Sequence, residues 1–519
     1  MYPGTFAATT PDKPAAIMAG SGEVLTYREL DDRSNQLAQL LWAAGLRPGD
    51  HVSIFMENSL RYYECFWAAV RSGLYFTTIN RYLQPEESAY ILKDSTSRAL
   101  FTSARMGELM ADIPALAPDV EILLSVDGGI EGFEDYETAI AAHPAERLER
   151  QPRGESMLYS SGTTGRPKGI KRPMVDIQVD DPAGASGVTL LVQGLFGVDA
   201  DTTYLSPAPL YHSAPLGFTT SMQSVGATVV VMERFDAAEA LKYLEQYKIT
   251  HSQWVPTMFS RMLKLPEEQR SGYDWSHHRV AVHAAAPCPV EVKRRMFDLW
   301  GPIIYEYYAG TEVNGFVFCS PDDWLGHPGT VGKSILGEIH ICDEMGKELP
   351  NGQSGTIYFE REEMPFEYHN DPEKTRNSQH PEHPTWSTLG DVGYVDDEGY
   401  LYLTDRKAFM IIAGGVNIYP QEIEDCLIMH PKVADVAVFG VPNEDLGEEV
   451  KAVVQLEQGI DQSDAMAQEL LAYAAEHLAR YKVPRTLDFR DELPRLPTGK
   501  LYKRILRDEY WGNTESKIV

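Results

Sequence analysis

The stretch YSSGTTGRPKG, from Tyr159 to Gly169, is rich in glycine and hydroxyl side chains. Glycines let backbone N–H groups approach a ligand closely, and the hydroxyls and the Lys168 ammonium add donors, so these residue types suit a phosphate. The stretch does not match the nucleotide-binding pattern GxxxxGK[ST], because Pro167 occupies its second glycine position and Gly169 follows the lysine. Composition alone leaves two interpretations open, a solvated surface loop and a phosphate-binding loop.

Further along the chain, other short stretches carry groups that could act on a nucleotide. In YYAGTEVNG, Glu312 offers a hard oxygen ligand of the kind that Mg²⁺ prefers, although a solvated acid after a strand is the alternative. In STLGDVGYVDDEGYLYLTDRKAF, Asp391 can accept two hydrogen bonds when ionised. In LPRLPTGKLYKR, Lys500 is a compact cation on a loop after Pro497 and Gly499, where a solvated surface lysine is the alternative.

Taken in order, these stretches resemble the motifs of the adenylate-forming superfamily, which includes acyl-CoA synthetases, luciferases and the adenylation domains of peptide synthetases. The resemblance runs from about Thr26 to Arg504 and is nearest to the fatty-acid-type AMP-forming acyl-CoA ligases. It implies a two-step reaction. A carboxylate attacks the α-phosphate of MgATP to give an acyl-adenylate and pyrophosphate, and a thiol such as that of CoA then displaces AMP.

The resemblance also implies roles for individual residues. The catalytic candidates are Lys500, Thr311, Glu312 and the possible acyl-pocket gate His212, which lies in PLYHSAPLG. The candidates for binding ATP phosphates are Ser160, Ser161, Gly162, Thr163, Thr164, Gly165 and Lys168, and those for Mg²⁺ are Glu312 and Thr163. The remaining nucleotide and CoA candidates are Ala285 and Tyr308 beside adenine, Asp391 and Arg406 at the ribose, and Gly414 and Gly415 beside the pantetheine arm.

Two positions depart from the family pattern. Ala309 stands where glycine is usual before the Thr–Glu pair. Ala408 stands two residues after Arg406, where the family usually has an acidic or basic hinge residue. In the family, the small C-terminal domain rotates about this hinge. A hinge needs backbone freedom more than one particular side chain, so the second departure leaves open which residue changes its backbone conformation.

The elements that must hold these residues have an α/β pattern. Apolar stretches near 50–58, 73–78 and 98–103 predict strands, and the intervening stretches 60–72 and 85–93 predict helices. Thr26 and Glu29 form a capping-box pattern at a helix start. The resemblance implies α/β subdomains over residues 1–404, binding ATP and the acid, and a small mobile α+β lid over residues 405–519 that carries Lys500.

Composition and charge disfavour some classes of function and indicate where the protein resides. The chain has 519 residues, 43% of them hydrophobic, and a net charge of −30, which disfavours binding to nucleic acid. Five cysteines are scattered without metal-ligand spacing. No signal peptide or apolar run long enough to cross a bilayer is visible, so we expect a cytoplasmic protein. A homodimer is compatible with the sequence, which does not fix the oligomeric state.

The sequence favours an acyl-CoA ligase for an apolar acid, fatty or bulky alicyclic, in lipid metabolism. The stretch YHSAPLGFT has no acidic residue to pair a substrate ammonium, which disfavours α-amino acids. Its neighbours suggest an apolar pocket; they are Pro215, Leu216, Phe218, Thr220, Trp254, Val255 and Met258. No carrier-protein signature follows Arg504, which favours free CoA as acceptor. The alternatives are another acceptor, as in a carrier-protein loader or a luciferase-like monooxygenase, and a binding protein without activity.

Overall fold

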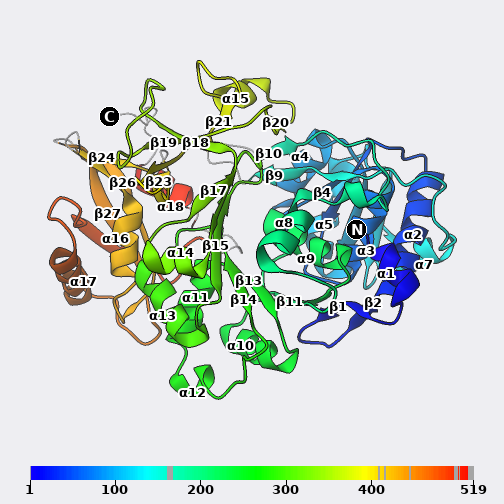
Figure 1. Ribbon diagram of the computed structural model, residues 1–519, viewed down its shortest axis with the longest axis horizontal. Coiled ribbons are helices and arrows are strands. Elements are labelled where there is room, and N and C mark those ends of the chain that lie inside the picture. The colour runs from blue at the N-terminus through cyan, green and yellow to red at the C-terminus, as the bar shows by residue number, and fades with distance from the viewer. Residues whose placement is uncertain are drawn as a thin grey trace.

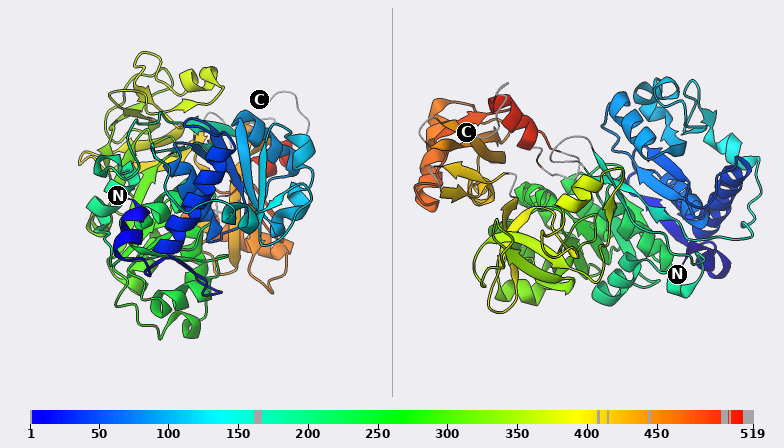
Figure 2. Two further views of the ribbon diagram at one scale, coloured as in Figure 1. Left: turned by 90° about the vertical axis from the view of Figure 1, so that its right-hand side faces the viewer. Right: turned by 90° about the horizontal axis from the view of Figure 1, so that it is seen from above.

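The computed structural model describes residues 2–160, 167–406, 409–413, 416–443, 446–495, 501 and 503–511. Two large and two smaller β-sheets form the N-terminal part of the chain, and their strands are interleaved in the sequence (Figure 1). A separate sheet forms the C-terminal part. Seen from above, the C-terminal part lies at one end of the molecule, away from the N-terminal sheet (Figure 2).

The first large sheet has six strands, all parallel, in the order β7-β6-β5-β3-β4-β8. Its strands are β3 (His51–Phe55), β4 (Tyr75–Thr78), β5 (Ser97–Ser103), β6 (Ile122–Val126), β7 (Glu134–Asp135) and β8 (Glu155–Ser156). The helices of this part are α1 (Pro3–Thr9), α2 (Tyr27–Ala43), α3 (Arg61–Arg71), α4 (Pro85–Asp94), η1 (Ala104–Met106), α5 (Gly107–Met110), α6 (Ile113–Leu116) and α7 (Tyr136–Ala141). Thr26 and Glu29 form the predicted capping box of α2.

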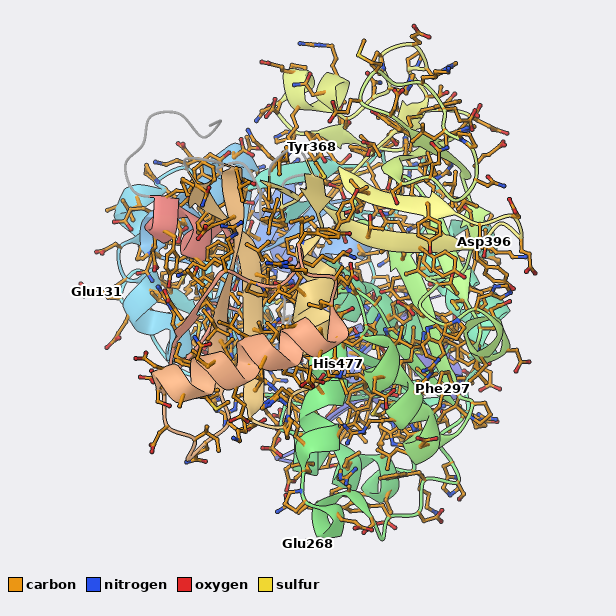
Figure 3. The ribbon with its side chains drawn as sticks, turned by 90° about the vertical axis from the view of Figure 1, so that its left-hand side faces the viewer. Glu131, Glu268, Phe297, Tyr368, Asp396 and His477 are labelled. Carbon is orange, nitrogen blue, oxygen red and sulfur yellow. The ribbon has the colours of Figure 1, made fainter. Side chains whose placement is uncertain are left out.

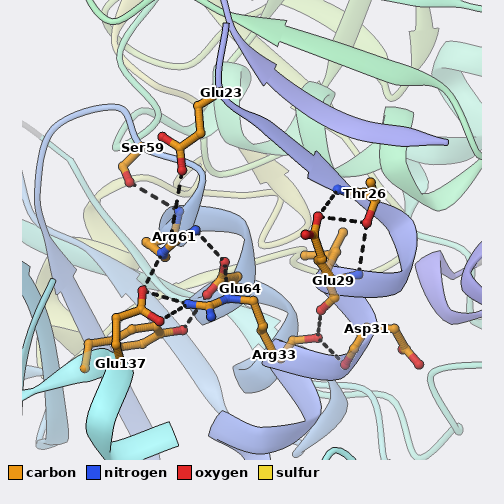
Figure 4. Close-up of polar contacts among 12 residues, drawn as sticks. Glu23, Thr26, Glu29, Asp31, Arg33, Ser59, Arg61, Glu64 and Glu137 are labelled. Atoms are coloured by element: carbon orange, nitrogen blue, oxygen red, sulfur yellow. Dashed lines mark hydrogen bonds and ion pairs between the residues drawn. The ribbon is translucent and has the colours of Figure 1, made fainter. Parts of the chain in front are cut away.

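A network of buried and half-buried charges joins α2, α3 and α7 (Figure 4). Glu64 on α3 is fully buried and pairs with Arg33 at 2.8 Å and with Arg61 at 3.0 Å. Glu137 on α7 binds both arginines, and the Tyr136 hydroxyl donates to Glu64 at 2.9 Å. Because each charge has an opposite partner, the network fixes how the three helices pack without leaving an isolated buried ion.

The second large sheet has nine strands in the order β17-β16-β15-β14-β13-β11-β12-β1-β2. Its strands are β1 (Pro14–Met18), β2 (Val24–Thr26), β11 (Thr203–Ser206), β12 (Thr228–Val231), β13 (His251–Trp254), β14 (Val280–His283), β15 (Ile304–Ala309), β16 (Phe316–Cys319) and β17 (Lys333–Leu336). Its helices are η2 (Pro182–Gly184), α8 (Gly187–Phe196), α9 (Ser213–Ser224), α10 (Ala237–Gln246), α11 (Pro256–Lys264), α12 (Glu267–Arg270), α13 (Val290–Trp300) and α14 (Pro321–Gly326). The six strands from β1 to β15 in this order are parallel, so the loops after β13, β14 and β15 emerge at one edge.

Two smaller sheets complete the N-terminal part. The three-stranded sheet contains β9 (Leu158–Ser160), β10 (Lys168–Lys171) and β20 (Glu367–Tyr368). The other contains β18 (Glu338–Cys342), β19 (Gly355–Glu360), β21 (Trp386–Ser387), β22 (Asp391–Val395) and β23 (Leu401–Arg406). The short helix α15 (Pro372–Asn377) follows β20. The first sheet therefore pairs residues near 160 with residues near 368, which are far apart in the sequence.

The C-terminal sheet has its own apolar core around Ile423, Val438 and Leu470. Its strands are β24 (Ile411–Ala413), β25 (Val416–Ile418), β26 (Val433–Asn443), β27 (Gly447–Leu456) and β28 (Thr486–Phe489), and its helices are α16 (Pro420–Leu427), α17 (Asp464–His477) and α18 (Lys503–Trp511). Figure 3 shows α17, which carries His477, crossing in front of this sheet. Together these sheets confirm the predicted α/β class with a smaller α+β C-terminal part.

Helix α17 is shorter than its sequence predicts. The residue pattern from Asp464 predicts a helix to Arg480, whereas α17 ends at His477. Leu478 has an extended backbone, with φ −121° and ψ 153°, and its side chain packs against the C-terminal core. Packing of this apolar side chain therefore ends the helix one turn early.

Candidate active site

A cleft of about 1610 Å³ lies where the two large sheets, the small sheets and the C-terminal part meet. The loops after β14 and β15 form one wall, and the hairpin of β9 and β10 with α15 forms another. Residues of α16, β26 and α18 line it from the C-terminal side. The predicted site residues that line this cleft are Lys168, His212, Ala285, Tyr308, Thr311, Glu312 and Asp391.

The glycine-rich stretch connects two antiparallel strands, β9 and β10. Ser160 ends β9 and pairs with Lys168, the first residue of β10, in antiparallel register. The predicted phosphate ligands Ser161, Gly162, Thr163, Thr164 and Gly165 lie outside the described residues, as does the side chain of Ser160. Lys168 forms an ion pair with Asp371 at 2.7 Å. This hydrogen bond raises the pKa of Lys168 and lowers that of Asp371, so both groups are charged.

The hairpin is tied to its surroundings by Asp94 and His369. The Tyr159 hydroxyl donates to Asp94 Oδ2 at 2.6 Å, and the Asp94 carbonyl oxygen is 3.0 Å from His369 Nε2. The His369 amide in turn donates to the Gly169 carbonyl at 2.8 Å. These contacts hold strand β9 at Tyr159 and strand β10 at Gly169 to α4 and to the end of β20.

Glu312 stands on a tight turn after β15. Val313, its neighbour, has a positive φ of 53°, and Thr311 lies beside it in the cleft wall. The Glu312 side chain is only 8% exposed, and its Oε1 accepts a hydrogen bond of 2.9 Å from the Tyr368 hydroxyl. Tyr368, labelled in Figure 3, comes from β20. The second carboxylate oxygen has no hydrogen-bond donor among the residues the structure describes, so the group fits Mg²⁺, which uses few protein carboxylates.

Tyr308 and Asp391 meet across two sheets. Tyr308 is near the end of β15 and Asp391 begins β22, and the tyrosine hydroxyl donates to Asp391 Oδ2 at 2.6 Å. Asp391 is 7% exposed and still lines the cleft. Arg406 pairs with Asp391 through the backbone register of β22 and β23, but its side chain lies outside the described residues. An aromatic face next to a buried carboxylate suits a base joined to a ribose.

The turn after β14 brings Ala285 to the cleft. Ala285 has a positive φ of 76°, a conformation that costs a non-glycine residue about 1 kcal/mol or more and is common at ligand sites. Behind this turn, Glu306 on β15 binds Lys293 on α13 at 2.6 Å and His283 on β14 at 3.3 Å. All three side chains are buried, and Glu306 lines the cleft. The Glu306–Lys293 ion pair, with the His283 ring packed beside it, fixes β14 and β15, which lead to Ala285 and Tyr308.

His212 is at the start of α9 and lines the cleft. Its ring centroid is 4.2 Å from that of Tyr211, whose carbonyl accepts a hydrogen bond of 2.6 Å from Thr78 Oγ1. The expected apolar pocket beyond it needs a correction, because Leu216, Phe218 and Trp254 pack in the core and do not line this cleft. The Phe218 ring stacks on Tyr307 at 5.7 Å, and this packing fills the space.

The C-terminal side of the cleft contains the residues that flank Lys500. Arg495 and Leu501 pair as an antiparallel bridge, and both line the cleft. Lys503 is buried against Glu424 at 2.8 Å, and Lys264 of α11 reaches across to Glu457 at 2.9 Å. Lys500, Gly414, Gly415 and the hinge candidate Ala408 lie outside the described residues.

Three residues of the site escaped the sequence analysis: Tyr368, Asp371 and Lys374. The signal was present in HNDPEK, because an aspartate followed by proline and glutamate is typical of a helix start, and Asp371 is the N-cap of α15. The helix was predictable from this pattern. That it packs against the hairpin near Lys168 was not, because the two segments are about 200 positions apart.

Comparison with known proteins agrees with this geometry. The model of the "AMP-binding enzyme" family matches residues 5–368, and that of its C-terminal domain matches residues 422–500. The fatty acid–[acyl-carrier-protein] ligase ScoC of Streptomyces coeruleorubidus is 31% identical over 98% of this chain and 95% of its own. The long-chain-fatty-acid–CoA ligase FadD13 of Mycobacterium tuberculosis is 29% identical over 97% of each chain. The anthranilate CoA ligase AuaEII, solved with anthranoyl-AMP, has a TM-score of 0.84 and 26% identity, with 98% and 96% coverage.

The chain therefore belongs to the AMP-binding enzyme family, the adenylate-forming superfamily that its motifs resemble. It is an ATP-binding, adenylate-forming ligase. Among the helices that the structure describes, none is both long and apolar enough to cross a membrane.

Proposed function

We propose that the protein is an AMP-forming acyl-CoA ligase, which activates an apolar carboxylic acid with MgATP and transfers the acyl group to CoA. The observation that carries this proposal is the gathering of three features around one cleft. These are the aromatic–carboxylate pair Tyr308 and Asp391, the buried carboxylate Glu312, and Lys168 at the start of β10.

In the proposed first step, the protein holds ATP in line with the substrate carboxylate. Tyr308 and Asp391 bind the adenine and ribose, and Lys168 with the glycine-rich loop binds the β- and γ-phosphates. Glu312 and Thr163 would hold Mg²⁺, which supplies charge neutralisation at the phosphates. Lys500 would stabilise the charge that develops as the carboxylate oxygen attacks the α-phosphorus.

In the proposed second step, the CoA thiol attacks the acyl carbon and AMP leaves. We assign residues 1–404 to the adenylation domain and residues 405–519 to a mobile lid that carries Lys500. Strand β23 belongs to the sheet of β18, β19, β21 and β22, whereas β24 belongs to the C-terminal sheet. The passage from one sheet to the next lies near this boundary, which supports the assignment. Gly414 and Gly415 would border the pantetheine arm, and His212 would gate the acid.

The identity of the acid rests on the sequence around His212. Because no carboxylate occurs between Tyr211 and Thr220, we propose an acid without a substrate ammonium. The likeness to the fatty-acid ligases ScoC and FadD13 supports an apolar acid, fatty or bulky alicyclic. A second candidate function is transfer of the acyl group to a carrier protein. The likeness to ScoC supports this alternative, as the likeness to FadD13 supports CoA.

The test is release of pyrophosphate and AMP from MgATP over a panel of acids, each with and without CoA. The panel extends from acetate through long-chain fatty acids to benzoate, cinnamate and a steroid acid. We expect one class to give AMP release that requires CoA. Pyrophosphate release that CoA leaves unchanged, but that an acyl carrier protein converts into acyl transfer, would select the second function. An absence of acid-dependent pyrophosphate release would contradict both.

Substitution Asp391→Asn tests the proposed ribose site. The amide can still accept from Tyr308, but it loses the charge that accepts from two ribose hydroxyls, and hydrogen bonds to a charged group contribute about 1.5–3 kcal/mol. We expect the KM for ATP to rise about 10-fold or more, with the KM for the acid nearly constant. Steady-state kinetics with each substrate varied in turn measures this. Tyr308→Phe is the control for loss of the Tyr308–Asp391 hydrogen bond alone, and a similar rise in both KM values would contradict the assignment.

A further inference from the structure

Lys374 lies in the first turn of α15, next to the phosphate end of the proposed ATP site. Asp371 joins the two: its Oδ1 accepts from the Lys374 backbone amide at 3.0 Å, and its Oδ2 binds Lys168 at 2.7 Å. The carboxylate therefore links the hairpin that carries Lys168 to the helix that carries Lys374. Both lysines line the same cleft.

The Lys374 ammonium lies over the face of Tyr368, with Nζ 4.5 Å from the ring centroid. The hydroxyl of that same tyrosine binds Glu312. Among the residues that the structure describes, no side chain or carbonyl gives this ammonium a hydrogen bond or an ion pair. Burial lowers the pKa of Lys374, and the nearby Glu312 opposes that change. Among the described residues this partly buried cation at the cleft wall contacts an aromatic ring and has no paired anion, so it is well placed to receive one.

The surrounding charges indicate which anion. The Lys168 charge is already neutralised by Asp371, and Glu312 adds a further negative charge. A polyphosphate entering this end of the cleft needs positive charge that is not already paired. Lys374 supplies it in a chain whose overall charge is −30.

We propose that Lys374 is a further catalytic residue, whose ammonium binds the β- and γ-phosphates of ATP and stabilises the departing pyrophosphate. This role rests on the proposed function. In the first step a bond forms between the carboxylate oxygen and the α-phosphorus, and the bond from that phosphorus to the β-phosphate bridging oxygen breaks. The electron pair goes to the pyrophosphate, so negative charge grows where Lys374 lies, and an ammonium there stabilises the transition state more than the bound substrate.

The experiment compares Lys374→Met, Lys374→Arg and the matched control Arg376→Met. Arg376 is an exposed cation on the same short helix. The readouts are pyrophosphate release from ATP and acid, inhibition by added pyrophosphate, and thioester formation from supplied acyl-adenylate. Thermal unfolding of each variant reports on its folding.

For Lys374→Met we expect kcat/KM for ATP in the first step to fall about 10- to 100-fold, as for loss of one charge-assisted contact. The inhibition constant of pyrophosphate should rise by a similar factor. Thioester formation from supplied acyl-adenylate should stay within about twofold, since pyrophosphate has already left by then. Lys374→Arg should recover most of the loss, and Arg376→Met should behave as the parent chain.

Unchanged kinetics and unchanged pyrophosphate inhibition in a folded Lys374→Met variant would overturn the proposal. So would an equal loss in both half-reactions, which would mean that the lysine only supports α15. Binding of ATP and pyrophosphate to the parent chain and to each variant, measured by calorimetry without acid or CoA, separates this outcome from failure of the proposed function. Loss of phosphate affinity in the variant would stand even if no acid were turned over.

Discussion

Replacing Lys500 with alanine is expected to lower the rate of adenylate formation about 100- to 1,000-fold, the usual loss for one preorganised charge at a transition state. In the proposed mechanism the lysine contacts the oxygens of the carboxylate and the α-phosphate only while the adenylate forms. Thioester formation from supplied acyl-adenylate should therefore remain largely intact. The flanking residues Arg495 and Leu501, which line the cleft from the C-terminal side, support this placement.

The two half-reactions are measured separately, by pyrophosphate release without CoA and by thioester release from acyl-adenylate with CoA. Lys432→Ala is the matched control, because Lys432 is a C-terminal lysine paired with Glu469 on the surface. Its half-reactions should match those of the parent chain. Equal losses of both half-reactions in Lys500→Ala would refute the division of roles between the two parts of the chain.

Replacing Glu306 with glutamine is expected to lower the free energy of unfolding by about 3–5 kcal/mol, because it leaves the buried ammonium of Lys293 without its counter-charge. Urea unfolding followed by tryptophan fluorescence measures the loss. The double variant Glu306→Gln with Lys293→Met removes both charges and should recover part of the stability. Equal stability of the single variant and the parent chain would show that the buried pair contributes little.

The same group gives a pH dependence with a definite sign. Burial alone would raise the pKa of Glu306, but His283 and Lys293 lower it from its ordinary value of 4.5 to about 2. A lowered pKa stabilises the fold above the unfolded value, and that stability is lost as the pH falls from about 4.5 towards 2. This carboxylate contributes about 3 kcal/mol to the free energy of unfolding over that pH range. The free energy of unfolding should therefore fall less steeply with decreasing pH in Glu306→Gln than in the parent chain, as measured by urea unfolding at several pH values. An unchanged slope would contradict this origin.

Much of the fold could be predicted from local pattern. The capping box at Thr26 and Glu29, and the strands β3, β12 and β14, depend on residues that are neighbours in the sequence. These elements can be recognised in the sequence because apolar alternation and helix caps involve only a few neighbouring residues. The motifs also identified the family, since their order and residue types are visible without any structure.

The contacts between distant segments could not be predicted in this way. The pair Tyr308 and Asp391, the pair Lys168 and Asp371, and the Tyr368 bond to Glu312 each join residues that are tens to hundreds of positions apart. No periodicity encodes which loop of one sheet meets which strand of another. For the same reason the prediction that Phe218 lines an apolar substrate pocket was wrong, because its ring stacks on Tyr307 in the core.

Three non-glycine residues around the cleft have left-handed backbones: Ala285, Val313 and Asn370. Ala285 lines the proposed site itself, and Val313 and Asn370 are next to Glu312 and Asp371, which line it. Turns held in so restricted a conformation are shaped before any nucleotide arrives, because the surrounding packing determines them. The rate at which ATP associates should therefore be governed by diffusion into the cleft and by movement of the C-terminal part, and not by rearrangement of these turns.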